Sequence, residues 1–368
     1  MKPYIYLRVL RHADHTVFCV EDGQKTYWDP VFNVPVPFSS GQQVKRSVME
    51  NMLENLGEKF APVTFNFEID TKGKLSNKEP WSPCDPSYID QLFGGWMRAK
   101  AEKSGKNEKQ KSDENNVRKR RSPISFSAMR PVHPLLAGLH TENITFDRSG
   151  CPENGNEQHP PVRVRRAGKE LTAEEISEFL TQNDRTIPPR TWIPGIKSAS
   201  GLFVYDIAID LRRLFCVSTG IYEPEIDKDT TEKLKNDGWK ETANVFGKCL
   251  IMPKEKRNRI IPALANAMID WRITSNQSRT FSLMETLAVA ISDNANTVAG
   301  AIRAKLAEDS DKPKAKPVVD AKAGAALFVT LPCAAYMLTE SESYDALDKA
   351  RQKLIEMLKS FNYENQAE

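Results

Sequence analysis

The segment Ser39–Arg46 reads Ser-Ser-Gly-Gln-Gln-Val-Lys-Arg and opens a run whose apolar spacing predicts a helix. The first N–H groups of a helix have no intrahelical partner, and the helix dipole favours an anion beside them. Lys45 and Arg46, assigned here to the first turn, conflict with the dipole, and a bound phosphate would relieve that conflict. A serine-capped, solvent-exposed helix start explains the same residues equally well. The candidate phosphate ligands are Ser40, Gln42, Gln43, Lys45 and Arg46.

The stretch Met97–Arg121 concentrates positive charge. It holds ten Lys and Arg against four Asp and Glu, a local charge of +6, whereas the whole chain carries only +3. Large apolar residues are almost absent from it, so a disordered basic stretch is predicted over 98–121. A solvated linker and a mobile basic arm that binds nucleic acid independently of its sequence are both consistent with this composition.

Two further polar segments could contact nucleic acid. The first, around 163–169, predicts a β-ribbon with a basic face that contacts nucleic acid, and a plain surface hairpin is the alternative. The second is a donor-rich loop expected between a helix and a strand, where helix capping is the alternative to sugar and phosphate contacts. Their candidate residues are Arg163, Arg165, Arg166 and Lys169 in the ribbon, and Gln277, Ser278 and Arg279 in the loop.

Signals for catalysis or metal binding are weak. The chain has no phosphate-binding glycine loop, dinucleotide fingerprint, serine-hydrolase elbow or HExxH motif. Its six cysteines are too far apart for a zinc site. His12 and His15 would face opposite sides of a strand, and Asp206 and Asp210 share a face expected to be solvated. We therefore expect no enzyme activity, no cofactor and no metal.

The composition is that of a water-soluble protein with a sizeable core. The chain has 368 residues, is 40% hydrophobic and 27% charged, and has a mean hydropathy of −0.52. No signal peptide and no spanning segment is expected, which predicts a cytoplasmic protein without a membrane partner.

The predicted elements are those of an α+β protein with a ferredoxin-like or RRM-like core and large insertions. Alternation of apolar and polar residues predicts strands at 4–10, 202–216, 247–252, 282–291 and 325–331. Helical spacing and helix-end signals predict helices at 44–56, 172–182, 254–271 and 344–361.

The residues from Asp29-Pro30 through Pro35-Val36-Pro37-Phe38 to Ser39–Arg46 resemble the backbone subunit of CRISPR Cascade complexes, the DevR-like "Cas-seven" family of the RAMP superfamily. Members carry a strand, a loop and a helix start of the type Ser-Ser-Gln-x-hydrophobic-Lys-Arg. Ser40, Gln42 and Val44 to Arg46 fit that pattern. The Ser278-Arg279 loop resembles a second element of the family.

The resemblance implies an RRM-like palm, an inserted fingers region and a β-hairpin thumb. The corresponding ranges are 1–72 with 201–368 for the palm, 73–160 for the fingers and 161–200 for the thumb, with its hairpin expected near 188–200. It also implies copies of the chain stacked in a helical filament along a guide RNA (crRNA), with target DNA and other Cascade subunits as partners. The residues expected to face target DNA are Arg118, Lys119, Arg120 and Arg121.

The chain departs from relatives that cut their target. Those relatives place an aspartate six residues before the Asp-Pro pair, where this chain has Gly23. The expectation is therefore a non-catalytic guide-RNA-binding subunit of a type I CRISPR complex. The alternatives are a metal-dependent RAMP-type ribonuclease that uses Asp22 and Asp206, and a general single-strand RNA-binding protein.

Overall fold

The computed structural model describes residues 2–18, 23–69, 71–98, 118–148, 162–220, 224–272, 282–307, 313–339 and 341–366. The chain divides into two compact units, Met1–Leu139 together with Ala199–Glu368, and His140–Ser198. Helices and strands are both abundant in it, as the predicted α+β class requires. No helix within these ranges is both long and apolar enough to cross a membrane.

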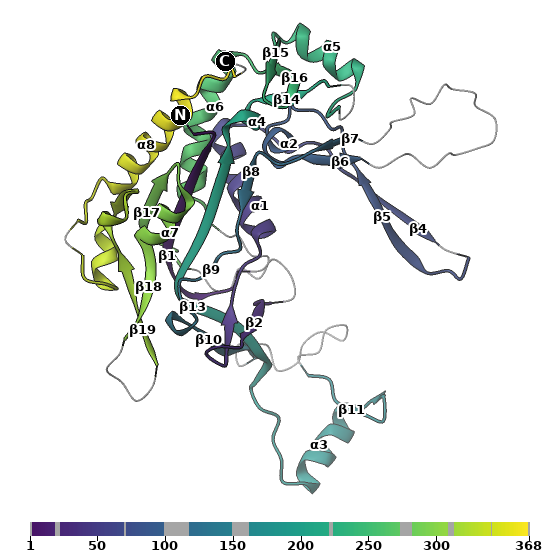
Figure 1. Ribbon diagram of the computed structural model, residues 1–368. Coiled ribbons are helices and arrows are strands. Elements are labelled where there is room, and N and C mark those ends of the chain that lie inside the picture. Colours follow the sequence, from purple (N-terminus) through teal and green to yellow (C-terminus); the bar gives the residue numbers. More distant parts are fainter. Residues whose placement is uncertain are drawn as a thin grey trace. The chain divides into compact units, whose positions relative to one another are not determined.

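An antiparallel sheet has the strand order β10-β13-β1-β17-β20 (Figure 1). The strands β1, β17, β20 and the second part of β13 lie in the first unit, and most of β10 belongs to the second. Two short strands, β8 and β9, pair with the edge of β13 that faces away from β1. The strand limits are β1 Tyr4–Thr16, β8 Ile124–Phe126, β9 Arg130–Pro131, β10 Ala137–Asp147, β13 Arg190–Asp210, β17 Thr286–Ser292 and β20 Ala326–Val329.

Three long helices cover one face of this sheet. They are α1 (Gly41–Leu56), α6 (Lys254–Ile269) and α8 (Ala346–Ser360), and they share one hydrophobic core with β1, β13 and β17. Alternation in β1 sends Ile5, Leu7 and Val9 into this core. The opposite face is covered in part by α7 (Ala295–Ala301) and η3 (Leu331–Ala335), which pack on Leu10 and Val204.

Local sequence signals set both ends of α1. The Ser40 side chain accepts a hydrogen bond from the Gln43 N–H at 3.3 Å, and Gly57 ends the helix with a left-handed φ of 67°. At the first helical residue, a Cβ on Gly41 would lie 2.7 Å from the Phe126 carbonyl oxygen. Only glycine therefore allows the start of α1 to approach β8 this closely.

Several small ribbons and helices extend from the first unit. The ribbons are β2–β3 (Thr26–Asp29, Val34–Pro37), β4–β5 (Thr64–Ile69, Leu75–Trp81), β6–β7 (Trp96–Arg98, Arg118–Arg120), β14–β16–β15 (Cys216–Ser218, Gly247–Ile251, Lys240–Asn244) and β18–β19 (Ile302–Ala307, Lys314–Val319). The short helices are α2 (Ile89–Gly94), η1 (Pro134–Leu136), α4 (Leu211–Leu214), α5 (Lys228–Asn236) and η2 (Ala321–Ala323).

The second unit, His140–Ser198, contains a small basic hairpin and a helix besides its share of β10 and β13. The hairpin joins β11 (Arg165–Arg166) and β12 (Lys169–Glu170). Helix α3 (Ala173–Gln182) confirms the helix predicted at 172–182 and begins with a capping box, in which Thr172 and Glu175 bond each other's backbone N–H groups.

The structure corrects several predicted limits. The predicted strand 202–216 ends at Asp210, because the Asp210 side chain caps α4 at the Arg212 N–H. The predicted disordered stretch 98–121 is ordered at both ends, where Arg98 and Arg118 pair in β6–β7, and residues 99–117 lie outside the described part. The segment 188–200, expected as the thumb hairpin, contains the first half of β13, which pairs with β10.

The predicted palm, fingers and thumb ranges do not coincide with the two compact units and stay predictions. Residues 73–139, assigned to the fingers, belong to the same compact unit as the predicted palm. The second unit begins inside the predicted fingers and ends inside the predicted thumb.

Arg11 lies in the helix-covered core and is fully buried. Its guanidinium donates to the carbonyls of Trp271 at 2.6 Å and Ile269 at 2.7 Å, at the C-terminal end of α6. It also lies over the rings of Trp271 and Tyr205, 4.5 and 5.5 Å from their centroids. Burial lowers the pKa of Arg11. The carbonyls and the ring faces compensate for the lost hydration.

We expect Arg11→Ala to lower the free energy of unfolding by about 3 kcal/mol or more, since it leaves carbonyls unsatisfied and a cavity beside two aromatic rings. Urea denaturation followed by circular dichroism measures the loss. Arg121→Ala, which removes an exposed guanidinium, is the matched control and should change stability by less than about 0.5 kcal/mol. Equal stability of the two variants would contradict the role given to Arg11.

Candidate nucleic-acid interface

The start of α1 is held against β9 and presents polar groups to solvent. The Ser39 N–H donates to the Met129 carbonyl at 2.9 Å, and the buried Ser39 hydroxyl donates to the Phe18 carbonyl. Next to this anchor, Ser40 is half-buried and Gln42 is exposed. No acidic residue lies in the first turn. This helix end therefore combines a positive dipole end with an accessible amide, as an anion-binding site requires.

Lys45 and Arg46 lie in the second turn of α1, because the helix begins at Gly41. The Lys45 Nζ donates to the Gly94 carbonyl oxygen at 2.6 Å, at the C-terminal end of α2, and burial lowers the pKa of Lys45. The Arg46 Nε bonds the Glu50 carboxylate at 2.6 Å, and its guanidinium lies 3.9 Å from the centroid of the Phe60 ring.

Some of the five candidate phosphate ligands face solvent, and the others already have hydrogen-bond partners within the chain. The Gln43 side chain donates to the Ser47 hydroxyl at 3.3 Å and, like Lys45, has a partner within the chain. Ser40 and Gln42 are the predicted residues that flank the open helix start. Arg46 is exposed but already paired with a carboxylate. Of the predicted residues, the hydroxyl and the amide are therefore the best placed to meet a phosphate.

Arg120 was expected to face target DNA, and this prediction is wrong. Its side chain is 1% exposed and pairs with the buried Glu225 carboxylate at 2.6 Å. It also donates to three carbonyl oxygens, those of Leu92, Arg213 and Cys216. The guanidinium thus ties the β6–β7 ribbon to α2, α4 and β14. Its neighbours Lys119 and Arg121 are exposed, and Arg118 is half-buried.

The remaining basic candidates lie elsewhere. Arg163, Arg165, Arg166 and Lys169 are in the second unit, where Arg163 pairs with Glu170 at 3.5 Å and Arg166 lies over the Phe179 ring. The candidates Gln277, Ser278 and Arg279 lie outside the described residues.

The aspartates of the ribonuclease alternative have other partners in the structure. Arg8 pairs with both oxygens of Asp206, at 2.6 and 3.0 Å. Asp22, the other aspartate of this alternative, lies outside the described residues. Asp210, predicted to share a strand face with Asp206, accepts a hydrogen bond from Arg212 at 2.8 Å. Within the described ranges, no group of three or more His, Cys, Asp or Glu could hold a metal ion.

The two histidines near the end of β1 belong to separate hydrogen-bonded groups. His12 Nδ1 lies 3.0 Å from the Glu285 carboxylate and 2.9 Å from the Tyr336 hydroxyl. His15 Nδ1 lies 3.0 Å from the Asp14 carboxylate. A register shift in β1 between Ala13 and Thr16 accompanies this separation.

A groove of about 420 Å³ opens on the sheet face opposite the long helices. The Arg8–Asp206 pair lies in its wall, together with Tyr6, Ser127 and Asn296. The Ser127 hydroxyl accepts from the Asp206 N–H at 2.8 Å, and Gly41 of α1 packs against the backbone of Phe126 and Ser127. The groove thus adjoins the start of α1.

Sequence reasoning missed Arg8, although alternation in β1 places its side chain on the face opposite the core residues Leu7 and Val9.

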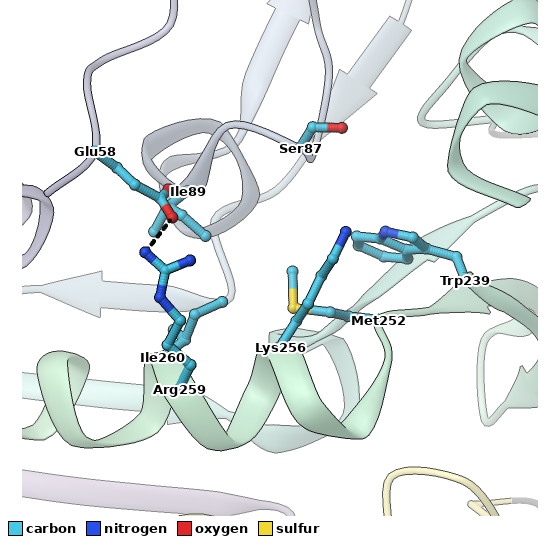
Figure 2. Close-up of a pocket in the computed structure, with 8 residues that line it drawn as sticks. All are labelled: Glu58, Ser87, Ile89, Trp239, Met252, Lys256, Arg259 and Ile260. Carbon is cyan, nitrogen blue, oxygen red and sulfur yellow. Dashed lines mark ion pairs between the residues drawn. The ribbon is translucent and has the colours of Figure 1, made fainter. Parts of the chain in front are cut away.

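Figure 2 shows a second, smaller cavity of about 210 Å³ beside the first turns of α6. Arg259 and Glu58 form an ion pair of 3.2 Å on one side of it, and Lys256 lies beside Trp239 on the other. The paired Glu58 offsets the Arg259 charge, so Lys256 supplies the remaining positive charge among the lining residues.

The chain was compared with known proteins. No family profile and no curated protein matches it. One similar solved structure is a chain of a "CRISPR RNA-guided surveillance complex", at 12% identity and a TM-score of 0.38 over 97% of this chain and 84% of that one. Another belongs to a "CRISPR RNA-guided surveillance complex, pre-nicking", at 10% identity and a TM-score of 0.44 over 96% of this chain and 89% of that one.

We expect Arg120→Ala to destabilise the protein by about 3–5 kcal/mol, because it leaves the buried Glu225 carboxylate without its principal partner. Thermal and urea unfolding measure this loss. The double variant Arg120→Met with Glu225→Gln should recover part of it, since it removes both buried charges. A stable Arg120→Ala protein with weakened binding of DNA would contradict the structural role and restore the original prediction.

Proposed function

We propose that this chain is a non-catalytic guide-RNA-binding backbone subunit of a type I CRISPR surveillance complex, which holds the guide for pairing with target DNA. The observation that carries the proposal is the start of α1, where the half-buried Ser40 and the exposed Gln42 lie at a first turn without acidic residues. Backbone N–H groups and the helix dipole make such an end suited to a phosphate. The same residues carry the resemblance of Asp29–Arg46 to the Cascade backbone family.

The topology of the first unit supports an RRM-like palm. Strands and long helices follow in the order β1, α1, β10, β13, α6 and β17, and the sheet order is β10-β13-β1-β17. This is the arrangement of the split βαβ fold, with β20 added at one edge. The chain between β10 and β13 and the ribbons β4–β5 and β6–β7 are insertions between these core elements, at sequence positions suited to a thumb and fingers.

The β4–β5 ribbon supports contacts with further subunits. Phe65, Phe67 and Ile69 alternate along β4 and are 74%, 58% and 68% exposed, while Lys78 and Glu68 pair on the opposite face. A two-stranded ribbon with an uncovered apolar face is marginal in water, and large exposed apolar patches mark interaction sites. In the proposed assembly, other copies of the chain or other subunits cover this face.

The proposal assigns shape and phosphate recognition to the protein and sequence recognition to base pairing. A chain with a net charge near zero suits this role, because the protein would bind the guide through a few positioned groups and not through a high overall charge. The ribonuclease alternative would require Asp206 to leave its two bonds with Arg8. The Ser40–Gln42 site needs no such rearrangement.

We expect the chain, expressed together with a CRISPR repeat–spacer transcript, to co-purify with RNA of uniform length in a particle that holds several copies of the chain. Gel electrophoresis and sequencing of the RNA, with the particle mass by native mass spectrometry, measure this. Bound RNA of random length and sequence would favour the general single-strand binder. Magnesium-dependent shortening of the RNA, lost in Asp206→Ala, would favour the ribonuclease.

Gln42→Glu tests the phosphate site without loss of the fold. A carboxylate in the first turn of α1 should keep or raise stability by about 0.3–1 kcal/mol through the helix dipole, yet repel a phosphate. We therefore expect weaker RNA binding by a protein that is at least as stable. Fluorescence anisotropy with labelled RNA and thermal unfolding give the two values.

Gln352→Glu, an exposed position on α8 with the same charge change, is the matched control and should bind RNA as the wild type does. Equal RNA affinity of the two variants would contradict an anion site at the start of α1.

A further inference from the structure

We propose that Trp28, on the β2–β3 ribbon, is a stacking platform for an unpaired base of the bound RNA. This inference rests on the proposed function, since it names a contact of the same RNA. Trp28 is 57% exposed, although tryptophan is among the costliest side chains to leave in water. Indole rings stack on nucleobases of any sequence, and each such contact contributes substantially to the binding of single strands.

The strand pairing directs Trp28 outward. In the β2–β3 register, Tyr27 is opposite Val36, which is fully buried, and Trp28 is opposite Pro35, which is exposed. Residues that are directly opposite share a face of the ribbon. Tyr27 therefore lies on the inner face, edge-on to Phe38 at 5.8 Å, and Trp28 lies on the outer face.

The indole ring is held in place before any ligand binds. Its Nε1 donates to the Asn33 side-chain oxygen at 3.2 Å, and Asn33 has the left-handed φ of 54° that the turn requires. The Asp29 carboxylate accepts the N–H groups of Val31 and Phe32 and closes the turn. A ring already fixed in one orientation loses little entropy when a base stacks on it.

The ribbon is also anchored to the rest of the first unit. The Phe32 ring packs edge-on against His133 at 4.6 Å, and β3 lies beside β9. A platform on this ribbon would therefore keep its position relative to the sheet and to the start of α1.

Two cations lie near the β2–β3 ribbon. Lys25 is exposed just before β2. The Arg130 side chain on β9 is 43% exposed and pairs with Asp206 at 3.5 Å. Proteins that bind single-stranded RNA combine rings that stack on bases with cations that contact phosphates.

The platform and the proposed phosphate site lie close together along the chain. Only four residues separate Pro35, opposite Trp28, from Ser40 at the start of α1. Even a fully extended chain would span at most about 17 Å over this stretch. One short RNA segment could therefore place a base on Trp28 and a phosphate at α1.

The test compares RNA affinity and its salt dependence in the full chain. The probe is a short fluorescein-labelled single-stranded RNA of mixed sequence, measured by anisotropy at several salt concentrations. We expect Trp28→Ala to weaken binding about ten-fold with an unchanged salt slope, because stacking releases no counterions. Trp28→Phe keeps a ring and should recover most of the affinity. Lys25→Ala should instead reduce the salt slope.

Tyr344→Ala is the control, because it removes an aromatic ring that is 89% exposed elsewhere in the first unit and should leave RNA affinity unchanged. Trp28→Ala binding within two-fold of the wild type would overturn the stacking inference and leave the proposed function intact. A changed oligomeric state with unchanged RNA affinity would also overturn it, since Trp28 would then contact protein. Failure of the wild type to bind RNA would overturn both.

Discussion

The buried Arg11 guanidinium joins the central strand of the sheet to the end of a core helix, and the site depends on that junction. Arg11 bonds the carbonyl of Ile269, the last residue of α6, at the negative end of the helix dipole. It also bonds the carbonyl of Trp271 just beyond the helix, and it lies near the rings of Tyr205 and Trp271. Tyr205 in turn donates to the Met268 carbonyl at 2.7 Å, so β13 is tied to α6 as well. The sheet that supports β8, β9 and the start of α1 is thus locked to its helix layer.

A second buried cation performs the same task for the inserted ribbons. Arg120 connects β7 to α2, α4 and β14, while Lys45 of α1 reaches the last carbonyl of α2. In this chain, cationic side chains therefore repeatedly join one element to another by donating hydrogen bonds to carbonyl oxygens at helix ends. For nucleic-acid binding, the placement of the cations that remain at the surface matters more than the net charge of +3.

The sequence predicted much of the framework. Ser40 and Gly57 mark the ends of α1, Thr172 and Glu175 mark the start of α3, and alternation in β1 marks its buried face. The fates of Lys45 and Arg120 could not be predicted in the same way. Lys45 bonds Gly94, 49 residues away, and Arg120 bonds Glu225, 105 residues away. Neither residue spacing nor local charge predicts contacts between residues so far apart in the sequence. Trp28 was missed because its strand, β2, has only four residues beside a proline-bearing turn, too few for alternation to predict a strand.

The bound RNA is proposed to lie along the β2–β3 ribbon and the start of α1. Ultraviolet cross-linking of the purified RNA-bound particle, followed by mass spectrometry of the cross-linked peptides, tests this position most directly. We expect cross-links at Trp28 and in the segment 39–46. Bound RNA that cross-links only outside residues 25–46 would contradict it.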